Sequence, residues 1–374
     1  MAYEIEFMGV GKEVKKDADA ICMRWKVLNA DGSESYKVGV YDGGFEAHGM
    51  KMVEHMNRYY FDDPENKKGA TDKVVEFVAV SHPDSDHVSG VKHVLENFDV
   101  KKLVMNRPWL YVEELWSKVN DGRITKESLE ERLRRDYAAI DELEKIANKK
   151  GIPIVEAFQG TELSDGMVIC SPSKQFYLDL LVESQKTPLA EDDYRNALIK
   201  SFKEMRNYEL SLVETWSGEM LREDVETSAE NETSVVIRGI IDGSGFLLCG
   251  DAGIRALTEA MNYLDSLGED IRDTVSFYEI PHHGSRHNVS TSLLDRMIGK
   301  KVKRGELRGC SAFASAASES DHPLRMVTNA FIRRGVEVYK TSGNILRHCS
   351  GDMPKRDWGK ADAIGFQEEV EEWD

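Results

Sequence analysis

The sequence predicts a layered α/β protein, and three observations support that fold class. Short runs of apolar or alternating side chains recur along the chain, as in strands that are partly or fully buried. Charged segments with helical periodicity separate several of these runs. The chain has 374 residues, 41% of them hydrophobic, which is enough for one large core or two smaller ones. Alternating strands and helices are typical of layered α/β folds.

The chain begins with three strands and continues with alternating helices and strands. Residues 4–8 alternate between charged and apolar side chains, and the run 36–41 ends in the turn Asp42-Gly43-Gly44. Helices are expected over 49–60 and directly after Gly90. The strands predicted in this part are, in chain order, 4–8, 20–25, 36–41, 74–80 and 103–105.

The rest of the chain adds helices and a second set of strands. The charged, periodic segment 125–150 predicts a helix. We interpret two helical stretches, at about 110–148 and 175–228, as insertions in one domain that spans residues 1–374. The strands predicted in this part are 152–155, 167–170, 233–237, 245–249 and 275–280.

Composition and charge indicate which classes of protein this chain can belong to. The five cysteines are scattered and form no CxxC pair, which is typical of a reducing compartment, so a cytoplasmic location is expected. The N-terminal residues lack the pattern of a signal peptide, and no run approaches the ~20 apolar residues of a membrane helix. A formal net charge of −18 argues against a protein that coats nucleic acid.

Two charged segments each allow two interpretations. The basic run 296–308 is either a solvated loop or a track for an anionic substrate. In the second case the contacts would come from Lys300, Lys301, Lys303 and Arg304. The acidic end 368–374 is either a frayed tail or a peptide that docks a soluble protein partner.

Potential metal ligands follow three of the apolar strands. Loops that leave the same edge of a layered sheet converge in space, so we expect these side chains to meet. Both oxygens of Asp251 could bridge two ions ~3.5–4 Å apart, and such a pair lowers the pKa of a shared water. The pattern therefore predicts a hydrolytic metal centre. The residues concerned are His82, Asp84, Asp86 and His87 after 74–80, Asp251 after 245–249, and His282 and His283 after 275–280.

These motifs resemble the metallo-β-lactamase-type hydrolase superfamily. The pattern is closest to the soluble nuclease-like domain of the bacterial DNA-uptake channel ComEC, whose start resembles residues 7–11 followed by Asp19-Ala20-Ile21. The second half also resembles that domain, over 231–236 and 322–339. The resemblance implies a four-layer αββα sandwich with helical insertions and with metal ions at one edge of the two sheets.

The resemblance does not account for all the ligands of the first of the two ions. The superfamily commonly has a histidine where this chain has Asp84, and its isolated third histidine has no obvious counterpart here. The second ion would take Asp86, His87, Asp251 and one of the two adjacent histidines. We expect His283 to be the ligand and His282 to contact substrate or a ligand, with the reverse still open.

Carboxylate ligands shift metal preference away from zinc. The chain is therefore expected to bind one or two divalent ions, zinc or manganese with magnesium as a third option, one held firmly and one exchangeable. Further roles follow from the resemblance. Asp86 and His282 would be catalytic, and His322 would donate a proton to the leaving group or bind a phosphate. Asp42 would orient a metal-binding histidine, and Ser285 and Arg286 would contact substrate.

Two classes of function remain. The first is a metal-dependent hydrolase, specifically a phosphodiesterase or nuclease that directs a metal-activated hydroxide at a phosphodiester, with nucleic acid as the expected substrate. A small molecule such as a cyclic nucleotide, lactone or thioester is the alternative substrate. The second class is a partner-gated effector, inactive alone, that docks a soluble protein through its helical insertions or acidic tail.

Overall fold

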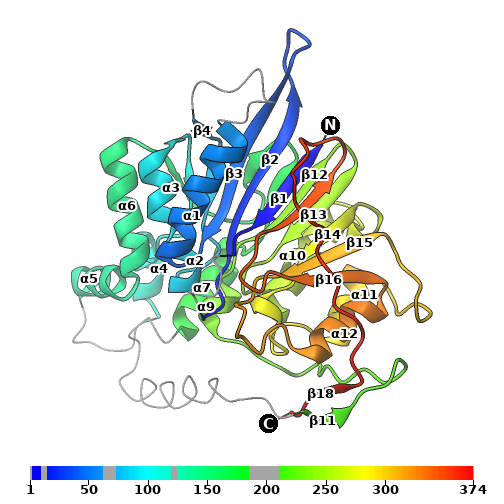
Figure 1. Ribbon diagram of the computed structural model, residues 1–374. Helices are drawn as coiled ribbons and strands as arrows, with labels where there is room; N and C mark the ends of the chain where they lie inside the picture. The colour runs from blue at the N-terminus through cyan, green and yellow to red at the C-terminus, as the bar shows by residue number, and fades with distance from the viewer. Residues whose placement is uncertain (1, 10–14, 62–72, 119–124, 185–209, 374) are drawn as a thin grey trace.

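Two mixed seven-stranded sheets lie at the centre of the protein (Figure 1). The structure is a computed structural model that describes residues 2–9, 15–61, 73–118, 125–184 and 210–373. The first sheet has the order β17-β1-β2-β3-β5-β7-β8, with bounds Leu346–Ser350, Tyr3–Phe7, Ala20–Leu28, Glu34–Gly43, Phe77–Ala79, Leu103–Val104 and Ile154–Val155. The second has the order β16-β15-β14-β13-β12-β10-β9, with bounds Val336–Lys340, Cys310–Ala314, Val275–Glu279, Ser244–Leu248, Val236–Ile241, Met167–Ser171 and Glu162–Ser164.

Strand direction decides where the connecting loops meet. In the first sheet β3, β5, β7 and β8 run parallel, and in the second β13, β14, β15 and β16 do. Loops that follow parallel strands gather at one edge of a sheet. The predicted strand 74–80 is split, because β4 (Val74–Val75) pairs with β6 (Asp99–Val100) while β5 joins the large sheet.

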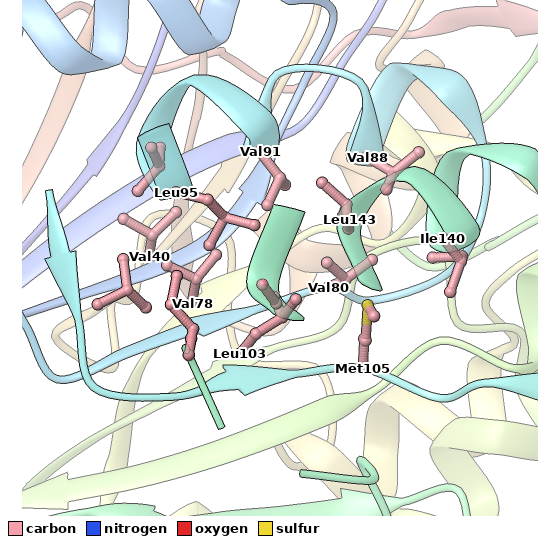
Figure 2. Close-up of a cluster of buried hydrophobic side chains, with 14 of the residues drawn as sticks. Val40, Val78, Val80, Val88, Val91, Leu95, Leu103, Met105, Ile140 and Leu143 are labelled. Carbon is pink, nitrogen blue, oxygen red and sulfur yellow. The ribbon is translucent and has the colours of Figure 1, made fainter. Parts of the chain in front are cut away.

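Helices cover the outer face of the first sheet. They include α1 (Glu46–Met56), α3 (Val91–Asn97) and α6 (Ala138–Lys150) (Figure 1). Buried aliphatic side chains join these helices to the sheet, and each one stabilises the fold by ~1.5–3 kcal/mol. Figure 2 shows this core, with Val40, Val78, Val80, Val88, Val91, Leu95, Leu103, Met105, Ile140 and Leu143 labelled.

The second sheet is covered in the same way by α10 (Ile254–Ser266), α11 (Thr291–Met297) and α12 (Arg325–Arg333). Between the two sheets lies an aromatic core, in which the ring of Phe277 is 5.9 Å from that of Phe7 and 4.9 Å from that of Phe313. The order of layers is helices, sheet, sheet, helices. The predicted layered α/β fold class is confirmed.

The first predicted insertion contains α4 (Val112–Trp116), α5 (Lys126–Asp136) and α6. Leu129 and Leu133 of α5 belong to the same buried cluster as the first sheet, so these helices complete the outer layer. The second insertion begins with α7 (Lys174–Glu183), and its residues 185–209 lie outside the described part of the chain. Within the described ranges, no helix is both long and apolar enough to cross a bilayer.

Part of the second insertion is a strand and not a helix. β11 (Leu210–Val213) pairs with β18 (Glu369–Glu371), so the acidic end of the chain is docked and not frayed. Val370 is fully buried there. The Glu371 carboxylate accepts hydrogen bonds from the backbone N–H groups of Arg325 (2.7 Å) and Met326 (3.2 Å), which lie at the start of α12. A carboxylate at a helix N-terminus satisfies donors that the helix itself leaves unpaired.

Glycines allow the end of the third strand to touch the short helix α2 (Ser85–Val88) and its flank. A Cβ atom at Gly90 would lie 2.0 Å from the carbonyl oxygen of Gly43, so a larger residue would force the two segments apart. The backbone N–H of Gly44 donates to the carbonyl of His87 at 3.0 Å. This close approach brings His87 next to Asp42.

Candidate metal centre

Four segments bring potential ligands to the same edge of the molecule. The loops after β5, β13 and β14 leave the carboxyl ends of parallel strands, as the sequence predicted. The fourth segment precedes β2 and carries Asp19, which reaches this edge because β2 is antiparallel to β3, with Ala20 opposite Gly43. Asp19 was not predicted as a ligand. The only signal in the sequence was its place in the segment that resembles the start of the ComEC domain.

Asp19, His87, Asp251 and His283 form a buried cluster that we call the inner group. Each offers one ligand atom, and these atoms all lie within 4.8 Å of one another. Nε2 of His87 is 3.1 Å from Oδ1 of Asp251 and 3.9 Å from Oδ2 of Asp19. Nδ1 of His283 is 3.6 Å from Oδ2 of Asp19, and its Nε2 is 3.7 Å from Oδ2 of Asp86.

The other oxygen of Asp251 faces a second cluster, which we call the outer group and which contains His82, Asp84 and His282. Nε2 of His82 is 3.6 Å from Oδ2 of Asp84 and 3.8 Å from Oδ2 of Asp251. Nε2 of His282 is 3.4 Å from the same Asp251 oxygen. Asp251 therefore spans the two groups, with one oxygen toward each.

The adjacent histidines point into different groups because of their backbone. His282 (φ 48°) and His283 (φ 56°) are both left-handed, and Gly284 (φ 96°) follows. Such conformations are uncommon for residues other than glycine and often mark functional turns. Here they let His282 face the outer group while His283 faces the inner one. His282 thus gives the outer group an additional imidazole, for which the sequence had offered no obvious counterpart.

Hydrogen bonds on the far side hold the imidazoles in place. Asp42 lies 2.8 Å from Nδ1 of His87 and accepts the backbone N–H of Ser81 at 2.7 Å, so the predicted contact between Asp42 and a histidine is present. Nδ1 of His282 lies 3.0 Å from Oδ1 of Asn288. The Asn288 amide also donates to the Asp251 carbonyl at 2.8 Å. Contacts of this kind fix the orientation of a ligand ring.

Glu279 fixes the turn that carries Asp251. Its carboxyl accepts hydrogen bonds from the backbone N–H groups of Cys249 and Gly250, the latter at 2.8 Å. Burial raises the pKa of Glu279 well above its ordinary value, and the nearby charge of Asp19 acts in the same direction. Glu279 ends β14, the strand that also leads to the histidine pair. One side chain therefore connects the two loops of the second sheet.

The charges of the inner group compensate one another. Burial would raise the pKa of Asp251, but the neighbouring imidazoles outweigh it and hold this pKa well below its ordinary value. Burial would lower the pKa of His283, but the carboxylates of Asp19, Asp86 and Asp251 outweigh it and raise this pKa to about 10. The imidazoles thus favour the ionised form of Asp251, and the carboxylates favour the protonated form of His283.

Buried polar atoms without a hydrogen-bond partner test whether these residues fit a metal. Such atoms are rare in folded proteins and call for a bound water or ion. Imidazole nitrogens and carboxylate oxygens together are donors that zinc and manganese accept, so the two groups fit divalent cations. Within the inner and outer groups, the atoms concerned are Oδ2 of Asp19, Oδ1 of Asp251, Nε2 of His82, Nε2 of His87 and both ring nitrogens of His283.

A further buried cluster, Glu6 with Cys22 and His55, does not fit a cation. Glu6 already pairs with Nε2 of His55 at 2.7 Å. Its other oxygen lies 3.5 Å from Arg347 and 3.8 Å from Arg356, and positive guanidinium groups would repel a metal ion. We assign this cluster to the stability of the first sheet.

The remaining predicted substrate contacts lie elsewhere. β15 is parallel to β14, so the basic run 296–308 leads to the start of β15, at the edge opposite the ligand groups. Lys301 pairs there with Glu219 at 3.6 Å, and Arg304 lies over aromatic rings. Lys300 and Lys303 belong to the same run. Arg286 is near the histidine pair but fully buried, stacked on Trp373 at 4.5 Å, and Ser285 is also buried.

The opening beside the ligands is a pocket of about 360 Å³. One wall is the loop that carries Asp84 and Asp86, and the other is the turn between α5 and α6, with Asp136 and Tyr137. The first insertion therefore contributes directly to the surroundings of the metal centre. Carboxylates dominate the polar side chains of this pocket.

Comparison with known proteins agrees with this geometry. Residues 37–160 match the family model of the metallo-beta-lactamase superfamily. The matched range is about a third of the chain. The matched range includes Asp42 and the ligand loop after β5, whereas Asp19, Asp251 and the histidine pair lie outside it.

Among solved structures, this chain is similar to a long form RNase Z from yeast, with 11% sequence identity and a TM-score of 0.35. The similarity covers 84% of this chain and 37% of the RNase Z chain, so the present chain spans little more than a third of that protein. No match was found among curated proteins.

Proposed function

We propose that this chain is a metal-dependent hydrolase that cleaves phosphodiesters. The observation that supports the proposal most strongly is that Asp251 directs one carboxylate oxygen into each of two clusters of imidazoles and carboxylates. The superfamily match adds to it. The resemblance of the motifs to the ComEC nuclease-like domain favours a phosphodiester over other substrates and remains a prediction.

Different residues have different roles in the proposed reaction. The inner and outer groups would hold one divalent cation each, and such cations would lower the pKa of water and stabilise the negative charge that develops on a pentacoordinate phosphorus centre. Asp251 would keep the two positions close together. Asp42 and Asn288 would hold His87 and His282 with Nε2 toward the centre.

Nucleic acid and small phosphodiesters are both candidate substrates, and one observation favours the small ones. The basic run 296–308 lies at the opposite edge, and the described residues that line the pocket beside the ligands include no lysine or arginine. Tight binding of a polynucleotide depends on cationic side chains that neutralise its successive phosphates. A nuclease of this design would act on one phosphate at a time, with weak contacts to the rest of the strand.

The experiment measures hydrolysis by the full chain with zinc or manganese. The substrates are bis(4-nitrophenyl) phosphate, a cyclic nucleotide, single- and double-stranded DNA, RNA, a lactone and a thioester. Activity that disappears in Asp251→Ala and persists in Asp352→Ala, a change at an exposed aspartate, would support the proposal. Activity confined to a lactone or thioester would contradict it. Inactivity on every substrate would favour the partner-gated alternative.

A further inference from the structure

The turn that carries the histidine pair needs support from its surroundings. His282 and His283 both have a positive φ, which residues other than glycine keep only where neighbouring groups fix them. The two rings enter different ligand groups. A change in this turn would therefore displace a ligand of the inner group and a ligand of the outer group together, so whatever holds the turn acts on both cation positions.

Arg286 follows the histidine pair closely and connects it to the segment 369–373. Its side chain is fully buried. Nη1 of Arg286 donates a hydrogen bond to the carbonyl of Glu372, and the guanidinium carbon lies 4.5 Å from the centre of the Trp373 ring. The centre of the His287 ring is 5.8 Å from that of the same indole. Two successive residues after the turn thus contact Trp373.

The segment 369–373 is itself anchored at several points. Its strand β18 pairs with β11 and buries Val370 fully. Nε1 of Trp373 donates to the carbonyl of Met220 at 2.9 Å, and the guanidinium carbon of Arg222 lies 4.5 Å from the centre of the ring. The indole therefore has a position that is fixed independently of the histidine turn.

The same segment also supports the turn by a second route, through α12. The Glu371 carboxylate accepts the backbone N–H groups at the start of this helix. The loop from His322 to Leu324 leads into the helix, and the backbone N–H of Leu324 donates to the carbonyl of Gly284 at 3.1 Å. This hydrogen bond places the loop of His322 against the turn. The segment 369–373 thus reaches the turn directly and through the helix that it caps.

We propose that Arg286 and Trp373 are positioning residues of the metal centre, and that through them the segment 369–373 holds His282 and His283 in the conformation that binds the cations. The inference rests on the metal centre of the proposed function and adds to it the part of the chain that keeps this centre assembled. A guanidinium over an aromatic ring gains a cation–π attraction that is larger at buried sites. Its planar group can also donate hydrogen bonds in its own plane, which a lysine ammonium does not reproduce.

Substitutions of Trp373 in the full chain test the inference. Trp373→Ala removes the ring that Arg286 contacts, whereas Trp373→Phe keeps a ring and loses the indole N–H. We expect Trp373→Ala to weaken binding of Mn²⁺ at both positions by about 10–100-fold, the usual effect of a residue behind the ligands. Trp373→Phe should weaken it by less than about threefold, because the stacking partner remains. Isothermal titration with manganese measures both affinities.

Hydrogen exchange of the protein without added metal gives a readout that depends neither on cations nor on catalysis. The backbone N–H of Ser285 donates to the carbonyl of His282 at 2.9 Å, and that of Gly284 donates to the carbonyl of Pro281 at 3.0 Å. Exchange of these two amides should be faster in Trp373→Ala by about tenfold, because the lost contact stabilises the closed turn. Trp373→Phe should restore most of the protection.

Two further variants separate this role from general stability. Leu264→Ala removes a buried side chain of α10, so it should lower the urea midpoint of unfolding and leave manganese affinity unchanged. Arg286→Lys keeps the charge but loses the planar group, so it should have the same effects as Trp373→Ala.

The outcomes distinguish the inference from the proposed function. Unchanged manganese affinity and unchanged exchange in Trp373→Ala, or a loss at only one position, would overturn the inference and leave the proposed function intact. The expected losses in a wild-type background that hydrolyses no phosphodiester would support the inference and contradict the proposed function. A wild type that binds no cation would overturn both.

Discussion

The inner and outer groups share Asp251 but differ in their exposure to solvent. The inner side chains of His87, Asp19 and His283 are 0%, 2% and 4% exposed. In the outer group, His82 is 0% exposed, but Asp84 is 35% exposed and His282 is 25% exposed. Buried charged ligands cannot exchange a cation for water at low cost, because the uncompensated carboxylates would remain in a medium of low dielectric constant. The inner position should therefore hold its ion firmly and the outer one should exchange it, which gives the expected asymmetry a structural basis.

The largest effect is expected where the two groups meet. Asp251→Ala removes an oxygen from each, so both ions should be lost on dialysis and hydrolysis should fall by at least about 10²–10³-fold. Metal analysis together with phosphodiesterase assays measures this. A variant that keeps one tightly bound ion would show that the two groups do not depend on Asp251 equally.

A single substitution in each group should distinguish the ion of the inner group from that of the outer group. Asp19→Ala should release the firmly held ion, whereas Asp84→Ala should leave it in place and weaken only the exchangeable one. Metal content before and after dialysis, measured on both variants, is the readout. Wild-type protein that retains two zinc ions per chain after dialysis would contradict the difference between the groups.

A smaller effect is expected from residues behind the ligands. Asp42→Ala removes the hydrogen bond to His87 and should weaken metal affinity at the inner group by about 10–100-fold. Asp42→Asn keeps the shape and an acceptor oxygen, so it should lose less. Isothermal titration with manganese compares the two variants, and equal affinities in Asp42→Ala and the wild type would argue against the assigned role.

Over a single pH unit, a change in pH should have the smallest effect. The pKa of His283 in the ion-free protein is raised to about 10, so this ring is protonated at neutral pH and must lose its proton to bind a cation. Affinity at the inner group should therefore rise with pH between 6 and 8, by about tenfold per unit for each proton released. Titrations in buffers of different ionisation enthalpy count those protons. An affinity independent of pH would place the ion away from His283.

Much of the centre could be predicted because its signals are local. Polar clusters directly after buried strands identified the loops that carry His82, Asp84, Asp86, His87 and Asp251. Asp19 was not predicted as a ligand because it precedes a strand and is not part of a polar cluster after one. Only the antiparallel pairing of β2 and β3 brings it to the site. The opposite directions of His282 and His283 depend on two successive left-handed residues, which no spacing in the sequence reveals.

Errors arose where nearness in sequence was taken as nearness in space. The basic run 296–308 follows the histidine pair closely, but a helix separates them and the chain returns to the far edge before β15. Parallel strands always require such a return. The docked end of the chain could not be predicted either, because β11 and β18 pair across about 160 residues of sequence, and neither is long enough to signal a strand alone.

The shared carboxylate has a consequence for how the centre fills. When a cation draws charge from one oxygen of Asp251, the other oxygen becomes a poorer donor, so occupancy on one side reduces attraction on the other. Thermodynamic linkage makes that penalty equal in both directions. The two cations should thus bind in two resolved stages. The difference in binding free energy between the stages measures how strongly Asp251 couples the two positions.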